Sequence, residues 1–275
     1  MAKQAIAITP DNDPIWDTIC EETAVTAKQE PVLASFLHST ILNHRSLESA
    51  LSFHLAQKLE SPAASALILR DVIAQALCDP AIGIAVRCDL SAVIERDSAC
   101  DSYSVPFLYF KGFHALQAYR VAHWLWQQQR QSLALFLQNC ISTKFSVDIH
   151  PAAKIGRGTF IDHATGVVIG ETTVIGDNVS ILQSVTLGGT GKEDGDRHPK
   201  VGNGVLISAG AKILGNISIG DGAKIGAGSV VLQNIPAHTT AAGVPARVVG
   251  RPASQQPSLD MNHGINCDMD CTLDD

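Results

Sequence analysis

The stretch that decides the fold runs from residue 201 to residue 231 and reads VGNGVLISAGAKILGNISIGDGAKIGAGSVV. An aliphatic residue recurs in it at every sixth position. The same spacing occurs upstream with one threonine, so the two series are Ile149, Ile155, Ile161, Val167, Thr173, Val179 and Val185, then Val201, Ile207, Ile213, Ile219, Ile225 and Val231. A period of six fits neither an amphipathic helix nor a single strand, and it is typical of a β-helix of short parallel strands.

The hexads also predict how the coils stack. Each hexad supplies one flat face with its aliphatic side chain inward, and glycines and other small residues form the corners. Three hexads close one triangular coil, so residues eighteen apart should stack at the strand spacing of ~4.8 Å. The thirteen hexad positions therefore predict about four coils.

The six-residue phase breaks once, between Val185 and Val201, which are sixteen residues apart. Residues 188–200 in this gap are polar, charged and rich in glycine. We expect them to leave the coil as an inserted surface loop, a place where binding and catalytic groups tend to lie.

Composition narrows the possible functions. Of the 275 residues, 45% are hydrophobic, and the net charge is −7 without a basic cluster, which argues against nucleic acid or a membrane surface as partner. The seven cysteines are odd in number and scattered, which predicts reduced thiols in the cytoplasm rather than disulfides or a metal site. We recognise neither a signal peptide nor a membrane span.

The remaining sequence divides into a helical domain at 1–145, the β-helix at 146–250 and a tail at 251–275. Helical spacing of leucines after Ser46, and the pairs Ser61-Pro62 and Asp79-Pro80, indicate helix starts and ends. Two long helices are expected at about 106–129 and 132–144. The tail carries five Asp against one Arg without periodicity, so we expect it to be disordered. The predicted fold class is α+β.

Several groups could carry chemistry at the β-helix. Asp148 precedes the inward-facing Ile149 and Asp162 follows the inward-facing Ile161, so alternation along the strand turns both side chains outward, and His163 follows directly. Arg197 and His198 lie in the inserted loop. A histidine oriented by an aspartate is the usual device for taking a proton from a hydroxyl, although any one of these histidines could serve a structural role.

Two alanines, Ala209 and Ala227, are eighteen residues apart and should stack on consecutive coils. A strip without large side chains would let a thin, extended ligand such as a pantetheine arm lie against backbone amides. Corners of a β-helix also need small residues for steric reasons alone, so the strip by itself leaves both interpretations open.

The motifs taken together resemble the serine O-acetyltransferases of cysteine biosynthesis. The resemblance covers nearly the whole chain up to the tail. It rests on YFKGFHALQAYR at 109–120, DIHPAAKIG at 148–156, DHATG at 162–166, SVTLGGTGK at 184–192 and DRHPK at 196–200. The motif GVPA at 243–246 is shared by many hexapeptide acyltransferases and is less specific.

This resemblance implies a left-handed β-helix and transfer of an acetyl group from acetyl-CoA, a co-substrate rather than a permanently bound cofactor, to L-serine, with inhibition by L-cysteine. It implies trimers that pair into a hexamer through their helical domains, with sites between neighbouring subunits. By this resemblance His163 is the general base and Asp148 is the carboxylate that orients it. The serine pocket is lined by Asp97, Asp162, Arg197 and His198, and His198 also belongs to the catalytic residues. The coenzyme binds along Gly189, Ala209 and Ala227. No metal ligand is implied.

One feature departs from the family. Members that dock into O-acetylserine sulfhydrylase end in isoleucine, whereas this sequence ends in Asp274 and Asp275, so we expect that partnership to be weak or absent. Other functions on the same scaffold are an acetyltransferase for another small hydroxylated acceptor, a carbonic anhydrase with three histidine ligands, and a non-enzymatic scaffold. Three convergent histidines are not evident, and a scaffold would not need the Asp148, His163 and Arg197 set.

Overall fold

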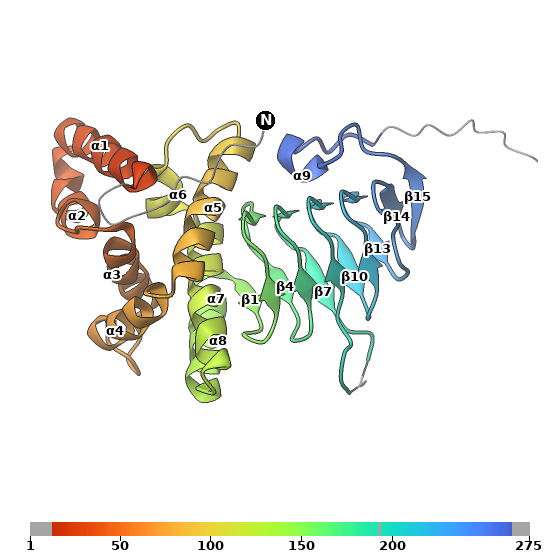
Figure 1. The fold of residues 1–275 in the computed structure, drawn as a ribbon, viewed down its shortest axis with the longest axis horizontal. Coiled ribbons are helices and arrows are strands. Elements are labelled where there is room, and N and C mark those ends of the chain that lie inside the picture. The colour runs from red at the N-terminus through yellow and green to blue at the C-terminus, as the bar shows by residue number, and fades with distance from the viewer. Residues whose placement is uncertain (1–12, 192–193, 266–275) are drawn as a thin grey trace, which may run out of the picture.

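A computed structural model describes residues 13–191 and 194–265 and consists of a helical part followed by a triangular solenoid (Figure 1). The helices before the solenoid are α1 (Pro14–Gln29), η1 (Pro31–Leu33), α2 (Ala34–Leu37), η2 (His38–Leu42), α3 (Leu47–Leu59), α4 (Ala66–Leu77), α5 (Pro80–Arg96), α6 (Ser104–Tyr109), α7 (Lys111–Gln127) and α8 (Gln131–Phe145). Within the described part, no helix is both long and apolar enough to cross a membrane.

Most of the predicted helix signals act as expected. The Ser46 side chain accepts a hydrogen bond from the backbone amide of Ser49 and caps α3, and Asp79 caps α5 directly before Pro80. The prediction that Ser61-Pro62 begins a helix is wrong: Ser61 and Ala64 bond to each other in a tight turn, and α4 starts at Ala66. The long helix expected at 106–129 is divided at Phe110, whose ψ of 108° is not helical.

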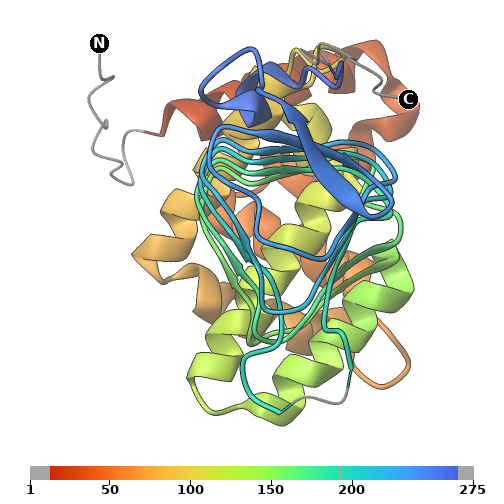
Figure 2. The same cartoon turned by 90° about the vertical axis from the view of Figure 1, so that its right-hand side faces the viewer.

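The solenoid is a left-handed parallel β-helix with three faces, and its coils superimpose as a triangle when viewed along the axis (Figure 2). Its faces are sheet C, with strands β1 (Val147–Ile149), β4 (Val167–Ile169), β7 (Thr186–Gly188), β10 (Lys212–Leu214) and β13 (Val230–Val231); sheet D, with β2 (Lys154–Ile155), β5 (Val174–Ile175), β8 (Lys200–Val201) and β11 (Ser218–Ile219); and sheet E, with β3 (Phe160–Ile161), β6 (Ser180–Ile181), β9 (Leu206–Ile207), β12 (Lys224–Ile225), β14 (Thr240–Gly243) and β15 (Ala246–Gly250). The five strands of sheet C correspond to five turns, one more than predicted.

The strand register confirms eighteen-residue stacking for some turns, where Ile169 pairs with Leu187 and Ile207 pairs with Ile225. In the first turn Ile161 pairs with Ile181, twenty residues on. In the turn that contains the inserted loop Ile175 pairs with Val201, twenty-six residues on. The first turn thus carries two extra residues that the hexad count did not detect.

The extra residues escaped notice because two positions of each hexad face inward. The expected stacking residues Val167, Thr173, Val179 and Val185 are buried, but each lies two positions before the residue that stacks on the first coil. A series with a spacing of six therefore continued through them without a visible break. The two-residue extension lies between β3 and β4, which is the corner that contains Asp162 and His163.

The helical part is joined to the β-helix by a buried polar network. Asp89 of α5 is 1% exposed and pairs with Arg120 of α7, while Asp89 Oδ1 also accepts from the backbone amide of Thr159. Arg120 in turn donates to the backbone oxygen of Gly156 at 2.8 Å. A buried ion pair is costly unless each group is fully hydrogen-bonded, and here the bonds cross from the helices to the first coil. They fix α5 and α7 against the solenoid.

The expectation of disorder from residue 251 onward does not hold for residues 251–265. This segment returns over sheet E, where α9 (Pro257–Asp260) contacts α5 and β9, and Pro257 and Ser258 are buried. The Ser180 hydroxyl donates to the backbone oxygen of Ser258 at 2.9 Å. Composition alone missed this docking because it depends on a few buried groups rather than on a periodic apolar face. Residues 266–275, on which the sulfhydrylase prediction depends, lie outside the described residues.

Candidate active site

His163 lies at the extended corner between β3 and β4. Its backbone φ is 55°, and that of Ala164 is 61°, so two residues that carry side chains adopt the left-handed conformation in succession. Such backbone strain is concentrated at functional sites, where the surrounding structure compensates for it. The turn is tight, with the amide of Ala164 only 2.6 Å from the Asp162 carbonyl oxygen, and it leaves the His163 side chain 73% exposed.

Helix α7 packs directly on this corner. A Cβ atom at Gly112 would lie 2.0 Å from the backbone oxygen of Ile161, so only glycine allows this approach. Lys111 of the same helix donates to the Thr165 hydroxyl. The helical motif identified in the sequence therefore supports the corner that carries His163.

Two carboxylates lie beside His163. Asp162 Oδ2 is 3.7 Å from His163 Nε2. Burial raises the pKa of Asp162, the His163 charge opposes this, and the nearby charge of Asp97 raises it further. Asp97 is the C-cap residue directly after α5, and the helix end and the loop after it pack on β3 through a small cluster of Ala92, Val93, Cys100 and Phe160. Asp162 thus lies beside His163, and the charge of Asp97 acts on Asp162, so the two carboxylates together favour a bound cation.

Asp148 lies on β1, one strand away from β4 in sheet C, with its Cα opposite Val168. Its Oδ1 atom accepts a hydrogen bond of 2.7 Å from Gln138 of α8. Among the described residues no hydrogen bond joins Asp148 to His163. The orienting role of Asp148 therefore stays a prediction, and Gln138 is a partner that the sequence did not suggest.

Arg197 and His198 are held at the corner between sheets C and D. Arg197 Nη2 donates to Glu171 at 2.6 Å, which lowers the pKa of Glu171. The Thr172 hydroxyl accepts from the backbone amides of Arg197 and His198, both at 3.0 Å. Glu171 and Thr172 were missed in the sequence because they occupy ordinary corner positions of a hexad, with no periodic signal.

The surroundings of His198 select one tautomer. The backbone amide of Thr172 donates to His198 Nδ1 at 3.2 Å, so Nδ1 is an acceptor and the ring proton lies on Nε2. The ring is 7% exposed, and burial together with the charge of Arg197 lowers the pKa of His198. A neutral imidazole with a free Nε2–H suits a hydrogen-bond donor to substrate better than a general base.

The two groups of residues lie at opposite edges of sheet C in one chain. Residues 162–166 connect sheet E to sheet C, whereas 189–199 connect sheet C to sheet D. The strands between them are three residues long at that level, which is roughly 10 Å at the usual rise per residue. One chain therefore does not bring Arg197 and His198 to His163 through its own fold.

The residues predicted to bind the coenzyme are also split between the two edges of sheet C. Ala209 and Ala227 follow paired strands, and the amide of Gly228 donates to the Ala209 carbonyl at 2.8 Å, which confirms that they stack on consecutive coils. They lie on the same corner line as His163, between sheets E and C. Gly189 lies at the other edge of sheet C, where an added Cβ would be 3.5 Å from the backbone oxygen of Arg197.

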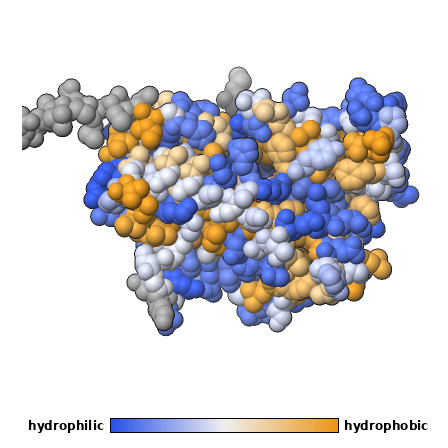
Figure 3. All heavy atoms as spheres, turned by 180° about the vertical axis from the view of Figure 1, so that it is seen from behind, coloured by the Kyte–Doolittle hydropathy of each residue, from blue (hydrophilic) through white to orange (hydrophobic). Residues whose placement is uncertain are grey.

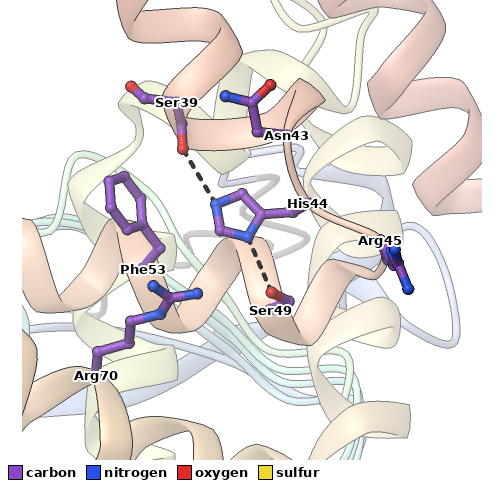
Figure 4. Close-up of a pocket in the computed structure, with 7 residues that line it drawn as sticks. All are labelled: Ser39, Asn43, His44, Arg45, Ser49, Phe53 and Arg70. Carbon is purple, nitrogen blue, oxygen red and sulfur yellow. Dashed lines mark hydrogen bonds between the residues drawn. The ribbon is translucent and has the colours of Figure 1, made fainter.

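Two concave spaces lie away from these residues. A cavity of about 500 Å³ in the helical part is lined by Ser39, Asn43, His44, Arg45, Ser49, Phe53 and Arg70, and both ring nitrogens of His44 are already bonded, to Ser49 and Ser39 (Figure 4). Another, of about 410 Å³, lies between α5, α7 and the first coil. Neither space is lined by His163, Asp162, Arg197 or His198. Among the described residues, no three side chains of His, Cys, Asp or Glu are grouped to hold a metal ion.

Comparison with known proteins agrees with this architecture. A family model described as "Serine acetyltransferase, N-terminal" matches residues 15–118, and one described as "Bacterial transferase hexapeptide (six repeats)" matches residues 198–233. The serine acetyltransferase of Salmonella typhimurium is 62% identical over 253 residues, which is 92% of this chain and 93% of that protein. The chain belongs to the serine acetyltransferase family. A crystal structure of the serine acetyltransferase from Vibrio cholerae superimposes with a TM-score of 0.91 at 60% identity, covering 92% of this chain and 98% of that one.

Three solved serine acetyltransferases carry relevant ligands. One is a complex with cysteine, with a TM-score of 0.90, 57% identity and coverage of 92% and 98% of the two chains. The Brucella abortus protein is in complex with coenzyme A, with a TM-score of 0.86, 52% identity and coverage of 88% and 97%. The soybean protein is complexed with serine, with a TM-score of 0.84, 59% identity and coverage of 86% and 97%.

Proposed function

We propose that this serine acetyltransferase uses His163 as general base for the transfer of the acetyl group of acetyl-CoA to the hydroxyl of L-serine. The observation that carries the proposal is the cluster at the extended corner. There an exposed imidazole projects from a strained turn beside the Asp162 carboxylate, and the charge of Asp97 acts on the same carboxylate. A carboxylate pair anchors the ammonium group of an amino acid, and the imidazole then lies close to its β-hydroxyl.

The reaction needs no covalent enzyme intermediate because serine supplies the nucleophile. His163 takes the hydroxyl proton as the serine oxygen bonds to the carbonyl carbon of the thioester. Collapse of the tetrahedral intermediate breaks the carbon–sulfur bond, and the departing sulfur takes the proton back from His163. O-acetyl-L-serine and CoA result. Asp148 orients the base and stabilises the imidazolium in this scheme.

The carboxylate of serine needs a cationic partner, and Arg197 is the candidate. Its guanidinium is tied to Glu171 and stands next to His198, whose Nε2–H is a free donor. An arginine fork matches a carboxylate in geometry and charge. Because this pair lies across sheet C from His163, we propose that it acts on serine bound to a neighbouring copy of the chain.

Assembly into trimers would place the edge between sheets E and C of one copy beside the loop of the next. We propose a trimer for this reason, and a hexamer formed by pairing of helical parts. The helical part exposes Val32, Leu67 and Ile68, at 87%, 71% and 60% of their surface. On the face seen in Figure 3, apolar side chains interrupt the hydrophilic surface over both the helical part and the β-helix. Such patches are typical of surfaces that other subunits cover.

The coenzyme would lie along the groove between two copies. Ala209 and Ala227 line its floor on one chain, and Gly189 comes from the loop edge of the other, so the split between these residues has the same explanation. The coenzyme A complex of the Brucella abortus protein supports acetyl-CoA as co-substrate.

Inhibition by L-cysteine follows from the same pocket. Cysteine keeps the ammonium and carboxylate groups of serine and replaces only the hydroxyl by a thiol, so Arg197 and the carboxylate pair should hold it equally well. The serine acetyltransferase complex with cysteine supports this part of the proposal. A cytoplasmic location stays a prediction.

The deciding experiment measures thiol release from acetyl-CoA on addition of L-serine. The expected result is release that depends on serine, with O-acetyl-L-serine formed in equal amount. Release with another hydroxylated acceptor but not with serine would instead identify a different hexapeptide acetyltransferase activity.

A further inference from the structure

Arg96, the last residue of α5, is buried in an unusual way. Its residue is 7% exposed, yet among the described residues no carboxylate bonds to its guanidinium. The other two buried arginines of the helical part do have carboxylate partners: Arg87 bonds to Asp13 and Glu48, and Arg120 to Asp89. Burying a cation without an anion is expensive, and the burial of Arg96 lowers its pKa to about 10. Stability alone does not account for this arrangement.

The guanidinium instead bonds to neutral groups of the second coil. Nη1 donates to the Ser180 hydroxyl at 3.1 Å and to the backbone oxygen of Val179 at 3.4 Å, and Nη2 donates to Asn178 Oδ1 at 3.4 Å. Nε has no hydrogen-bond partner in the described part of the chain. Arg96 therefore links the end of α5 to the start of β6 through several moderate bonds.

Both ends of this link lead to the candidate serine site. On the helix side, Asp97 follows Arg96 directly and ends α5, with its amide bonded to the Val93 carbonyl. On the solenoid side, Ser180 pairs in register with Phe160 on β3, the strand that runs into Asp162 and His163. The arginine thus spans the gap between the elements that carry the two carboxylates.

A tie is needed at this place because the two carboxylates repel each other. The end of α5 and the loop after it pack on β3 through Ala92, Val93, Cys100 and Phe160, and the charge of Asp97 raises the pKa of Asp162. Like charges favour separation until a cation binds between them. Apolar packing of Ala92 and Val93 on Phe160 holds α5 on β3, and Arg96 adds the polar contacts at the end of the helix, directly before Asp97.

We infer that Arg96 is a positioning residue for serine binding: its bonds to Ser180 and its neighbours hold the Asp97 carboxylate at the distance from Asp162 that an amino-acid ammonium group requires. This inference rests on the proposed role of Asp97. Arg96 does not touch the substrate. Since an ammonium anchor acts equally on the bound substrate and on the transition state, its loss raises KM for serine and leaves kcat and KM for acetyl-CoA nearly unchanged.

The test compares Arg96→Gln and Arg96→Lys with Arg87→Gln in the full-length protein. Arg87 is a buried arginine of the same helix, bonded at the far end to Asp13 and Glu48, so its replacement should lower the melting temperature without changing KM for serine. Arg96→Gln should raise KM for serine on the order of 10-fold, the usual scale for losing hydrogen bonds from a charged group. Arg96→Lys should recover part of the loss because an ammonium group still reaches one acceptor.

A double-mutant cycle with Asp97→Asn separates the inference from the function on which it rests. If Arg96 acts through Asp97, Arg96→Gln adds little to KM for serine once Asp97 is Asn. If Asp97→Asn raises KM for serine, two results overturn the inference and leave the proposed function intact. In one, Arg96→Gln raises KM by the same factor in the parent and in Asp97→Asn. In the other, Arg96→Gln does not change KM in the parent protein. An unchanged KM in Asp97→Asn removes the role of Asp97 and the inference with it.

Ser180→Ala covers the case in which Arg96→Gln does not fold. It removes the nearest acceptor of the guanidinium while leaving the charge in place. A smaller rise in KM for serine, again without a change in KM for acetyl-CoA, is expected. If the Ser180→Ala and Arg96→Lys proteins both fold and both keep the parent KM for serine, the positioning role is contradicted.

Discussion

Gly170 lies so close to His198 that a Cβ atom at position 170 would be 2.0 Å from Cδ2 of the imidazole ring. The same ring is fixed on its other edge by Thr172, which donates to Nδ1. His198 is therefore clamped between the end of β4 and the corner that follows it. The clamp orients the free Nε2–H, and glycine is the only residue at position 170 that leaves room for it.

Gly170→Ala should displace the imidazole of His198 and weaken serine binding. A shift of about 1 Å in a binding group costs on the order of 10²-fold in kcat/KM, and we expect most of that loss to appear with serine rather than with acetyl-CoA. Gly191→Ala is a matched control in the inserted loop, since an added Cβ there meets no atom within 4 Å. Steady-state kinetics with each substrate varied checks this, and equal behaviour of the two variants would contradict it.

His163→Ala should lower kcat by roughly 10² to 10⁴, the usual contribution of a general base. Asp148→Asn should cost less, because it disturbs orientation and leaves the base in place. His238→Ala is the control: His238 is exposed and has a left-handed backbone, with φ of 54°, but it lies on the last coil away from the candidate site. Near-normal turnover in a folded His163→Ala protein would exclude the proposed base.

The hexad pattern predicted the β-helix, its inserted loop and the stacking of Ala209 on Ala227. It did not predict the two-residue extension at His163, because each hexad has two inward positions that carry small or aliphatic residues. Val167 lies six residues after Ile161 and so continued the spacing, although Ile169 is the residue that stacks on the first coil. The contacts of the site escaped for a related reason. Glu171, Thr172 and Gln138 act through positions in space that no local pattern in the sequence encodes.

The acid stability of the helical part should depend on His54. Burial lowers the pKa of His54 to about 4, with the charge of Lys58 adding to the effect, and burial also places the pKa of the adjacent His114 well below its usual value. In the unfolded chain the same histidine has a pKa near 6.5. Its contribution to the free energy of unfolding is therefore fully present above that pH and is lost as the pH falls toward 4. His54 alone should contribute a loss of roughly 2 kcal/mol between pH 7 and pH 5.

The comparison with His54→Gln isolates this contribution, because glutamine can still donate to the Leu108 carbonyl and does not titrate. Urea unfolding of both proteins at pH 7 and pH 5 gives the two free-energy differences. The parent protein should lose more stability than the variant on acidification. An identical loss in both would assign the acid sensitivity to other groups, of which the buried His114 is the first candidate.

Arg197→Ala should weaken serine and L-cysteine together, because the guanidinium meets the carboxylate group that both amino acids share. We expect each dissociation constant to rise by roughly 10-fold or more, the scale of a lost charge-assisted hydrogen-bond pair. Calorimetric titration of both amino acids measures it. Cysteine binding that stays intact while serine binding collapses would point to a separate site for the inhibitor.

The last prediction concerns the division of the site between chains. If His163 of one copy works with Arg197 of the next, then His163→Ala and Arg197→Ala chains should complement each other when co-expressed with different tags and purified for both. A trimer that contains both chains has one junction of three at which an intact His163 meets an intact Arg197, so activity should return to about one third of the parent level, or to about one quarter if two random trimers pair into each hexamer. Co-expression of His163→Ala with a chain carrying both changes is the control, since no site can then contain an intact His163. Mixed assemblies as inactive as this control would mean that each chain builds its site alone, and that Arg197 must reach His163 across sheet C by a movement of the inserted loop.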